Sequence, residues 1–304
     1  MNRDSFAQTG STGVAKTTLS YLGPYRLLNV VHTGHASQLW QAYDDGKQRM
    51  VAVKAILEKA AKDPEHKGYL QQEFKVGVAI AHKNVIEVYK FDTDRGTPYL
   101  AMEWFAGMNL KKRIRAKEDR EKLIYFAPRI IGEAAEGLGN MHHLGWVHRD
   151  IKPDNFLVAD DGATKLIDFG LAKRAKGVLG KLFSLKSKRQ GTPSYMSPEQ
   201  IRCQPLDQRA DVYSFGCMVY EMFAGNPPFT GLTREELFTK HLKAPLPSLE
   251  AGDQNLTSEF VQLVKRCLSK DPEGRPGSAH DFLGEFRTLK VFRVQPRRPS
   301  PAAS

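Results

Sequence analysis

Short runs of β-branched, aromatic and other apolar residues fill the first third of the chain, and Gly, Asp and Pro separate them. This pattern predicts β-strands over Tyr25–Val31, Leu39–Tyr43, Met50–Ile56 and Thr97–Glu103. Between the third and fourth runs, residues Glu65–Ala81 carry the wider apolar spacing that is typical of a helix. We therefore expect a small sheet with one helix in this region.

After Gly107 the apolar positions recur at intervals of three and four, which predicts amphipathic helices. The expected helices cover Leu123–His143, Ala210–Ala224, Arg234–Leu242, Ser258–Leu268 and Ala279–Leu289. The second of these is apolar on nearly every face, so we expect it to lie at the centre of the helical part. A strand-rich part thus precedes a helix-rich part, which indicates an α+β protein without internal repeats.

Both ends of the chain lack this apolar pattern. Residues 1–20 are rich in Ser, Thr and Gly, and residues 290–304 are basic and rich in Pro. Segments of this composition bury too little apolar surface to fold. We expect flexible tails at these two ends, an N-terminal lobe over 21–105 and a C-terminal lobe over 106–289.

Composition and charge narrow the class of protein. The 304 residues are 41% hydrophobic and 26% charged, as in globular proteins. The net charge of +11 favours anionic partners without distinguishing nucleotides, nucleic acid, lipid and acidic protein. Three cysteines without metal-ligand spacing argue against a disulfide framework and a zinc site, and they favour a reducing, cytoplasmic location. We expect no secretory signal, because residues 1–20 have no apolar core, and no membrane span, because no apolar run reaches about 18 residues.

The most specific chemical pattern lies at residues 147–155, which read Val-His-Arg-Asp-Ile-Lys-Pro-Asp-Asn. Asp168-Phe169-Gly170 follows thirteen residues after the Asn. A single Asp or Asn would more simply be a turn residue, but eight fixed residues at fixed spacing make coincidence negligible. The pattern HRDxKxxN plus DFG resembles the protein kinase family.

This resemblance implies a bilobal protein kinase fold, with an antiparallel N-lobe sheet, one N-lobe helix and a mostly helical C-lobe. It also implies that Asp150 receives the proton of the substrate hydroxyl, and that Asn155 and Asp168 hold Mg²⁺ (Mn²⁺ being an alternative) against ATP. Lys152 resembles the lysine of Ser/Thr kinases, which neutralises the transferred phosphoryl group. The implied acceptors are therefore Ser and Thr hydroxyls of proteins.

An ion pair is expected in the N-terminal part of the chain. In the strand that ends at Lys54, Ala52 and Lys54 face one side. Glu73 lies within a largely apolar stripe of the helix that follows, where a carboxylate needs a counter-ion. An exposed strand lysine is the simpler interpretation of Lys54 alone, but the resemblance implies that Lys54 and Glu73 pair and align the α and β phosphates.

The phosphate-covering loop departs from the family pattern G-x-G-x-x-G-x-V. The matching residues, from His32 to Leu39, retain only Gly34 of the three glycines. Glycine lets backbone N–H groups approach phosphate closely, so we expect a stiffer loop and weaker ATP binding. His32 or His35 either donates to a phosphate when protonated or is an ordinary solvent-facing histidine.

The resemblance also implies an adenine pocket at the junction of the two lobes. Met102 would line its back, and backbone groups of Glu103 and Phe105 would bind the adenine edge. Ala52 and Leu157 complete the expected lining. Without the resemblance, residues 102–105 would read equally well as an ordinary strand end with aromatic packing.

The segment from Leu171 to Gln190 contains seven basic residues and no acidic ones, and the resemblance identifies it as the activation segment. Its end, Gly-Thr-Pro-Ser-Tyr-Met-Ser-Pro-Glu at 191–199, is similar to the substrate-docking loop of Ser/Thr kinases. We expect Thr192 to contact Asp150 and Lys152. The resemblance further implies an ion pair between Glu199 and Arg275.

Two further roles follow from the resemblance. Asp211 should hold the catalytic loop, although a helix-cap role is also compatible with its position. Arg149 precedes the expected base, as in kinases that are regulated by a phosphorylated activation segment. Because Lys188 occupies the usual acceptor position, we expect autophosphorylation at Ser184 or Ser187. A solvated basic loop that attracts acidic protein is the alternative.

A pseudokinase that binds nucleotide or serves as a scaffold is the main alternative function. The glycine-poor loop favours it, and so does Gly77, which stands where kinases usually place a bulky residue. The retained ionisable residues favour an active enzyme instead. A small-molecule phosphotransferase would not need the docking loop, and the basic tail gives no basis for specific nucleic-acid binding.

Overall fold

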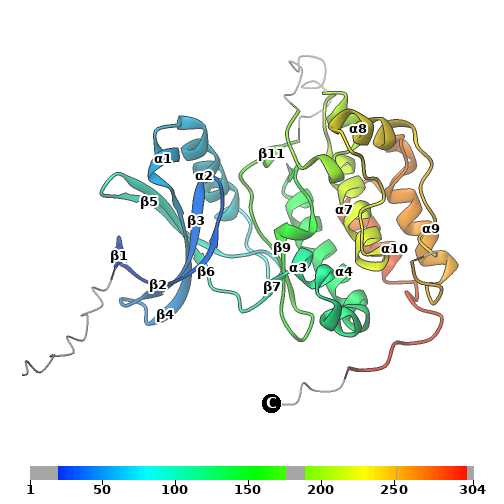
Figure 1. The fold of residues 1–304 in the computed structure, drawn as a ribbon, viewed down its shortest axis with the longest axis horizontal. Helices are drawn as coiled ribbons and strands as arrows, with labels where there is room; N and C mark the ends of the chain where they lie inside the picture. The colour runs from blue at the N-terminus through cyan, green and yellow to red at the C-terminus, as the bar shows by residue number, and fades with distance from the viewer. Residues whose placement is uncertain (1–19, 176–188, 251, 300–304) are drawn as a thin grey trace, which may run out of the picture.

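The computed structural model describes residues 20–175, 189–250 and 252–299. Figure 1 shows a sheet-rich N-terminal lobe beside a mostly helical C-terminal lobe. The expected α+β class and the order of its two parts are confirmed. Among the described residues, no helix has both the length and the apolar character needed to cross a bilayer.

The N-lobe is built on a six-stranded antiparallel sheet in the order β1-β2-β3-β4-β6-β5. Its strands are β1 (Tyr21–Leu22), β2 (Tyr25–Thr33), β3 (Ser37–Asp44), β4 (Arg49–Ile56), β5 (Val88–Asp94) and β6 (Thr97–Glu103). Sequence analysis missed β5. This strand lies at the sheet edge, where Lys90 and Asp92 face solvent and interrupt the apolar run that marks a strand.

Strand β4 separates the two faces of this sheet. Val51 and Val53 pack on one face in a small apolar cluster with Tyr25 and Tyr99. Ala52 belongs to the large core cluster on the opposite face, which continues into the C-lobe. The alternation predicted for this strand is therefore present, and it directs Lys54 towards the cleft between the lobes.

Two helices follow β4, α1 (Glu58–Ala61) and α2 (Pro64–Gly77). Asp63 caps α2, since its carboxylate accepts from the backbone N–H of Glu65, and Pro64 occupies the first helical position. The helix ends four residues before the predicted end at Ala81. Beyond Gly77 the N–H groups of residues 79 and 80 bond to carbonyls three residues back, which ends the α-helical hydrogen-bonding pattern.

Helices dominate the C-lobe: α3 (Leu110–Arg115), α4 (Arg120–His143), α6 (Pro198–Ile201), α7 (Gln208–Ala224), α8 (Arg234–Lys243), α9 (Ser258–Cys267) and α10 (Ala279–Phe286). Helix α7 is buried from Ala210 to Phe223, which confirms its predicted central place. Asp207 caps its start, and Gly225, with φ of 77°, ends it in the left-handed conformation.

Short strands complete the C-lobe. Strands β7 (Met108–Asn109), β9 (Phe156–Val158) and β10 (Thr164–Leu166) form a three-stranded sheet, and β8 (Trp146–Val147) pairs with β11 (Lys173–Arg174). These pairings hold the two ends of the segment that carries the HRD and DFG patterns. The segment is thereby fixed to the edge of the C-lobe that faces the N-lobe.

Packed chain continues beyond the expected lobe boundary at residue 289. Val291 and Phe292 are buried, and the Phe292 ring meets the Phe223 ring of α7 with centroids 6.0 Å apart. The N–H of Thr257 donates to the carbonyl of Val291 at 3.0 Å. Two apolar residues inside a basic, Pro-rich stretch are a weak sequence signal, although they anchor the chain here.

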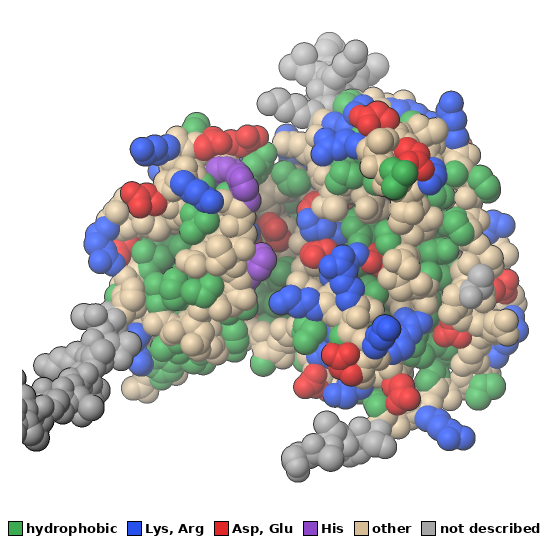
Figure 2. Space-filling model, viewed as in Figure 1, with side chains coloured by type: hydrophobic (Ala, Val, Ile, Leu, Met, Phe, Trp, Pro, Cys, Tyr) green, Lys and Arg blue, Asp and Glu red, His purple; other side chains and the backbone are tan. Residues whose placement is uncertain are grey.

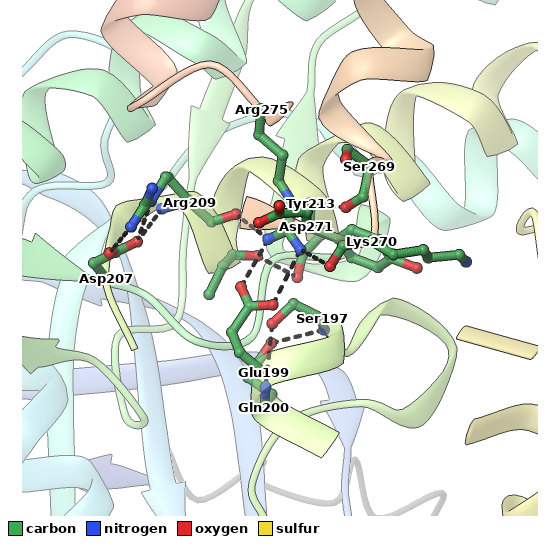
Figure 3. A network of polar contacts seen from close by, with 12 residues as sticks. Ser197, Glu199, Gln200, Asp207, Arg209, Tyr213, Ser269, Lys270, Asp271 and Arg275 are labelled. Carbon is green, nitrogen blue, oxygen red and sulfur yellow. Dashed lines mark hydrogen bonds and ion pairs between the residues drawn. The ribbon is translucent and has the colours of Figure 1, made fainter. Parts of the chain in front are cut away.

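A buried ion pair joins two distant parts of the C-lobe (Figure 3). Nη1 and Nη2 of Arg275 donate to the two carboxylate oxygens of Glu199 at 2.7 and 3.1 Å. The remaining guanidinium N–H groups donate to the backbone carbonyls of Arg209, Ser269 and Lys270. The expected Glu199–Arg275 pair is thus confirmed, and it fixes the start of α6 to the loop before α10.

Replacing Arg275 by Ala should lower the free energy of unfolding by about 3–5 kcal/mol, because the buried Glu199 carboxylate would lose its counter-ion. Urea unfolding measures this loss. The matched control is Arg266→Ala, which removes an exposed pair with Glu285 and should cost less than about 1 kcal/mol. Equal losses in the two variants would contradict the role assigned to the Glu199–Arg275 pair.

Gly77 leaves room for a side chain of the neighbouring strand. A Cβ at residue 77 would lie 2.3 Å from Cγ2 of Val88 and 3.6 Å from the Phe169 ring. Val88 of β5 therefore fills the volume that a larger residue of α2 would need. The glycine reflects a local packing solution between α2 and β5, and it does not by itself indicate a lost function.

Gly77→Ala should lower the free energy of unfolding by about 1–3 kcal/mol through overpacking. Gly68→Ala in the same helix, where a Cβ would meet nothing within 4 Å, should be neutral or stabilising. Combining Gly77→Ala with Val88→Ala should cost less than the sum of the two single changes. Chemical denaturation of the four variants tests this, and additive losses would refute it.

Candidate active site

Helix α7 anchors the catalytic loop, residues 148–155. The Asp211 carboxylate accepts from the backbone N–H groups of His148 at 2.6 Å and Arg149 at 2.8 Å. Its Oδ2 also lies 3.1 Å from His142 Nε2 of α4. The predicted anchoring role of Asp211 is confirmed, whereas the helix cap is Asp207. Arg149 has φ of 73°, a strained conformation of the kind found at functional sites.

Asp150 is surrounded by donors from its own loop and from the docking loop. Lys152 Nζ lies 2.7 Å from Asp150 Oδ2. The N–H and hydroxyl of Thr192 both donate to Oδ1 at 2.8 Å, and Lys152 Nζ donates to the Thr192 hydroxyl at 2.8 Å. The contacts predicted for Thr192 are therefore present. They join the catalytic loop to residues that lie forty positions further along the chain.

A second charged group lies across the cleft. Lys54 Nζ is 2.7 Å from Glu73 Oε2 of α2 and 3.6 Å from Asp168 Oδ1. The Glu73 side chain is only 4% exposed, whereas that of Asp168 is 43% exposed. The predicted pair is confirmed, and Asp168 connects it to the C-lobe. Asp168 has φ of 66°, a second strained residue at the site.

Burial and neighbouring charge set the ionisation of these three residues. Burial raises the pKa of Glu73 to about 7, although Lys54 opposes the rise. Burial also favours neutral Lys54, but the carboxylates of Asp168 and Glu73 outweigh it and raise the Lys54 pKa. The Lys54 ammonium in turn lowers the pKa of Asp168. We conclude that Lys54 is charged and that its ammonium keeps Asp168 ionised.

Strand register brings the expected nucleotide-binding residues of the N-lobe together. His32 lies opposite Leu39, and Leu39 lies opposite Lys54. Ala52 lies opposite Met102 of β6. These side chains therefore occupy neighbouring positions on four adjacent strands, β2, β3, β4 and β6. Leu157, the expected contribution of the C-lobe, lies in β9.

Glu103 and Phe105 form the connection between the lobes. The Glu103 N–H donates to the Glu87 carbonyl at 2.8 Å, and its carboxylate lies 2.8 Å from Lys165 Nζ. The Phe105 carbonyl accepts from the N–H of Gly107 at 2.9 Å, and Lys165 Nζ lies 5.8 Å from the Phe105 ring centroid. The hinge is thus held by side chains of both lobes, a feature that its own sequence does not reveal.

The phosphate-covering loop is a tight turn between β2 and β3. Gly34 N–H donates to the Ser37 carbonyl at 2.9 Å, and the Gln38 amide donates to the Thr33 hydroxyl at 3.0 Å. Gly34 does not adopt a positive φ. These two hydrogen bonds across the turn favour the stiff loop that we expect from its low glycine content.

Asn155 and Asp168, the two expected metal ligands, each carry a side-chain oxygen. The amide nitrogen of Asn155 donates to the Asp150 carbonyl at 2.8 Å, which directs the amide oxygen away from that bond. The N–H of Ile167 donates to the Asn155 carbonyl at 2.9 Å and brings the two loops together. An amide oxygen and an ionised carboxylate fit a Mg²⁺ ion. No group of three or more His, Cys, Asp or Glu residues suited to a metal occurs in the described ranges.

One cavity of about 780 Å³ is lined by the charged groups of both lobes, whereas Asn155 and the residues expected to bind adenine do not line it. Lys54 and Glu73 line it from the N-lobe, and Asp150, Asp168, Arg189 and Phe238 line it from the C-lobe. Figure 2 shows the hollow between the lobes, with acidic side chains inside it and Lys and Arg side chains on the C-lobe rim. The cavity can hold a polyanion beside Lys54 and a second substrate beside Arg189 and Phe238.

Several contacts around the cavity were not predicted. Gln72 of α2 donates to the Ala172 carbonyl at 2.7 Å, and the Gln190 amide donates to the Tyr69 hydroxyl at 3.3 Å. Gln200 donates to the Arg149 carbonyl at 2.9 Å. Glutamine and tyrosine at these positions carry no recognisable pattern, and their partners lie far away in the sequence.

A buried polar cluster beneath the docking loop was also missed. The Tyr195 hydroxyl donates to Glu221 Oε2 at 2.6 Å, and Lys111 Nζ donates to the Tyr195 hydroxyl at 3.0 Å. Lys111 and Glu221 are also ion-paired. A carboxylate within the apolar helix α7 was the one available sequence signal. The cluster fixes Tyr195, which follows Thr192 closely in the docking loop.

Arg149 remains without a counter-ion among the described residues. It is buried, and its Nε and Nη1 have no hydrogen-bond partner within the described ranges. Burial lowers its pKa, and the Asp211 charge opposes this effect. Such a guanidinium suits an additional anion. Ser184 and Ser187, the expected phosphorylation sites, lie outside the described residues.

The comparisons with known proteins agree with this geometry. Residues 25–285 match the family model described as "Protein kinase domain". A probable serine/threonine-protein kinase of Clostridium acetobutylicum is 33% identical over 88% of this chain and 40% of its own length. Serine/threonine-protein kinase PknB of Mycobacterium tuberculosis is 33% identical over 92% of this chain and 45% of its own length.

A probable serine/threonine-protein kinase of Streptomyces coelicolor is 31% identical over 86% of this chain and 39% of its own length. The chain therefore spans less than half the length of these curated relatives. The match of the family model nevertheless covers both lobes and every residue of the site described above. The chain belongs to the protein kinase family.

Proposed function

We propose that this chain is an active serine/threonine kinase that transfers the γ-phosphoryl group of ATP to Ser and Thr hydroxyls of proteins. One observation carries the proposal. Asp150, bonded to Lys152 and Thr192, lies in the same cavity as the Lys54–Glu73–Asp168 group. A proton acceptor and a phosphate-binding cation thus face one reaction space.

In this proposal the acceptor hydroxyl lies at Asp150. Its oxygen forms a bond to the γ-phosphorus while the bond from that phosphorus to the β-γ bridging oxygen breaks, and ADP leaves. Asp150 accepts the hydroxyl proton, and the Lys152 ammonium offsets charge on the transferred group. Thr192 orients both side chains through its hydroxyl. Positioning and charge stabilisation account for most of the catalysis.

Lys54 binds the α and β phosphates, and Glu73 holds Lys54 in place. Asn155 and Asp168 would hold Mg²⁺, with Mn²⁺ as an alternative. When bound, the ion neutralises charge on the triphosphate.

The remaining expected residues bind the rest of the nucleotide. Ala52, Met102 and Leu157 line the adenine pocket, and backbone groups of Glu103 and Phe105 bind the adenine edge. His32, Gly34 and Leu39 lie over the phosphates and sugar. The stiff, glycine-poor loop weakens ATP binding without removing any group that the chemistry requires.

The convergence of the ionisable groups disfavours a pseudokinase. A protein that only binds nucleotide has no need for a proton acceptor oriented by both Lys152 and Thr192. A small-molecule phosphotransferase is disfavoured by the docking loop, which Tyr195, Glu199 and Arg275 hold in place beside the cavity.

Asp150→Asn should lower phosphorylation of a general protein acceptor by about 10²–10⁴-fold, because the amide cannot accept the hydroxyl proton. Labelled ATP with Mg²⁺ measures the transfer. Glu259→Gln, an exposed carboxylate in α9 on the outer side of the C-lobe, is the matched control and should retain wild-type activity. Equal label in Asp150→Asn and wild type would reject the proposed function.

We further propose that a phosphate on Ser184 or Ser187 neutralises Arg149, whose buried Nε and Nη1 lack partners among the described residues. Mass spectrometry of the chain after incubation with Mg²⁺ and ATP should find phosphate on at least one of these serines. The Asp150→Asn variant incubated alone should carry none. A fully active enzyme that is unmodified at both serines would disprove this regulation.

A further inference from the structure

The part of the cavity that the docking loop and α8 line combines an apolar surface with positive charge. Met196 and Phe238 form a small buried cluster there with Ile201. The Arg189 guanidinium lies over the Phe238 ring, 5.0 Å from its centroid, and its Nε donates to the Ile201 carbonyl at 3.1 Å. Arg234, at the start of α8, lines the same part of the cavity.

These two arginines have no acidic partner among the described residues, since the ion pairs found there include neither of them. Within the described ranges, Nε is the one Arg189 group with a hydrogen-bond partner, so its terminal N–H groups remain available there. The acidic residues that line the cavity are Glu73, Asp150 and Asp168, and each is already paired with Lys54 or Lys152. This part of the cavity therefore carries positive charge that no acidic residue of the described chain balances.

Chain connectivity places this charge close to the reacting hydroxyl. Arg189 precedes Thr192 by three residues, and Thr192 is bonded to Asp150 at 2.8 Å. Three residues of extended chain cover at most about 11 Å. The long Arg189 side chain can therefore reach a group on the neighbouring one or two residues of a bound peptide, whose Cα atoms are about 3.8 Å apart.

ATP does not account for these arginines. Its phosphates belong at Lys54 in the N-lobe, whereas both arginines belong to the C-lobe. Stacking on Phe238 explains the position of the Arg189 stem, but it leaves the terminal N–H groups of Arg189 and the whole Arg234 side chain unexplained. Arginine presents a planar fork of donors that matches a carboxylate.

We propose that Arg189 and Arg234, with Met196 and Phe238, form an anion pocket for an Asp or Glu side chain one or two residues from the phosphorylated Ser or Thr. The preferred substrates are therefore acidic segments of proteins. The inference rests on the proposed kinase activity and names the substrate class of the same site. Arg189 and Arg234 are specificity-determining residues of the anion pocket.

The test uses peptides that contain one Ser and differ only at one of the two positions on either side of it, where Asp, Ala or Lys is placed. For at least one position, kcat/KM should be about tenfold higher with Asp than with Ala, and lowest with Lys, since a charged hydrogen-bonded pair has an effect of this size. Similar values for the three residues at every position would overturn the anion pocket.

Two variants and a control assign the preference to Arg189. Arg189→Met, which keeps an apolar stem over Phe238, should reduce the Asp-to-Ala ratio to about one, and Arg189→Glu should reverse the preference towards Lys. Arg297→Glu makes the same change in net charge as Arg189→Glu, but at an exposed position outside the cavity. This control should keep the wild-type Asp-to-Ala ratio. An unchanged ratio in folded Arg189→Met, judged by thermal unfolding, would refute the assignment.

The outcomes separate this inference from the proposed function. Phosphorylation that depends on Asp150 but is equal for Asp, Ala and Lys peptides overturns the anion pocket and leaves the kinase assignment intact. Absence of transfer to every peptide and to a general protein acceptor overturns both. A preference for Asp that disappears in Arg189→Met supports both.

Discussion

The burial of helix α7 is the constraint on which the C-lobe depends. Every polar group between Ala210 and Phe223 of α7 must find a partner inside the protein, because these residues are buried. Asp211 uses the backbone N–H groups of the catalytic loop for this purpose. Ser214 donates to the Tyr195 carbonyl at 2.7 Å, and Glu221 accepts from the Tyr195 hydroxyl. The hydrogen bonds of these buried α7 side chains thus fix both the catalytic loop and the docking loop, which meet at Asp150.

Charge is distributed along the cleft in a consistent order. In the N-lobe, the Lys54 ammonium is balanced by Glu73 and Asp168. At the catalytic loop, Asp150 is oriented by donors rather than buried among apolar groups. At the docking loop and α8, Arg189 and Arg234 lack such balance within the described ranges. The proposed function and the proposed anion pocket assign a different anion to each of these two cationic parts.

Much of the site could be predicted because it depends on local patterns. The alternation of strand β4 predicted the direction of the Lys54 side chain. A carboxylate within an apolar helix stripe needs a counter-ion, which indicated Glu73. The fixed spacing of the HRD and DFG patterns identified the catalytic loop. Contacts that depend on the approach of distant segments could not be predicted. The bond from Gln72 to Ala172 joins residues 100 positions apart, and polar strand β5 is held by its neighbour rather than by its own composition. The packed Phe292 is an example of the same limit.

Helix α2 meets three different parts of the molecule within five consecutive residues. Tyr69 bonds to Gln190, Gln72 to Ala172 and Glu73 to Lys54. The two ends of the activation segment and Lys54 are therefore all bonded to one helix. If the proposed function holds, a shift of that segment would move the helix that holds Lys54, and a protein bound to the outer face of α2 would act on phosphoryl transfer without entering the cleft.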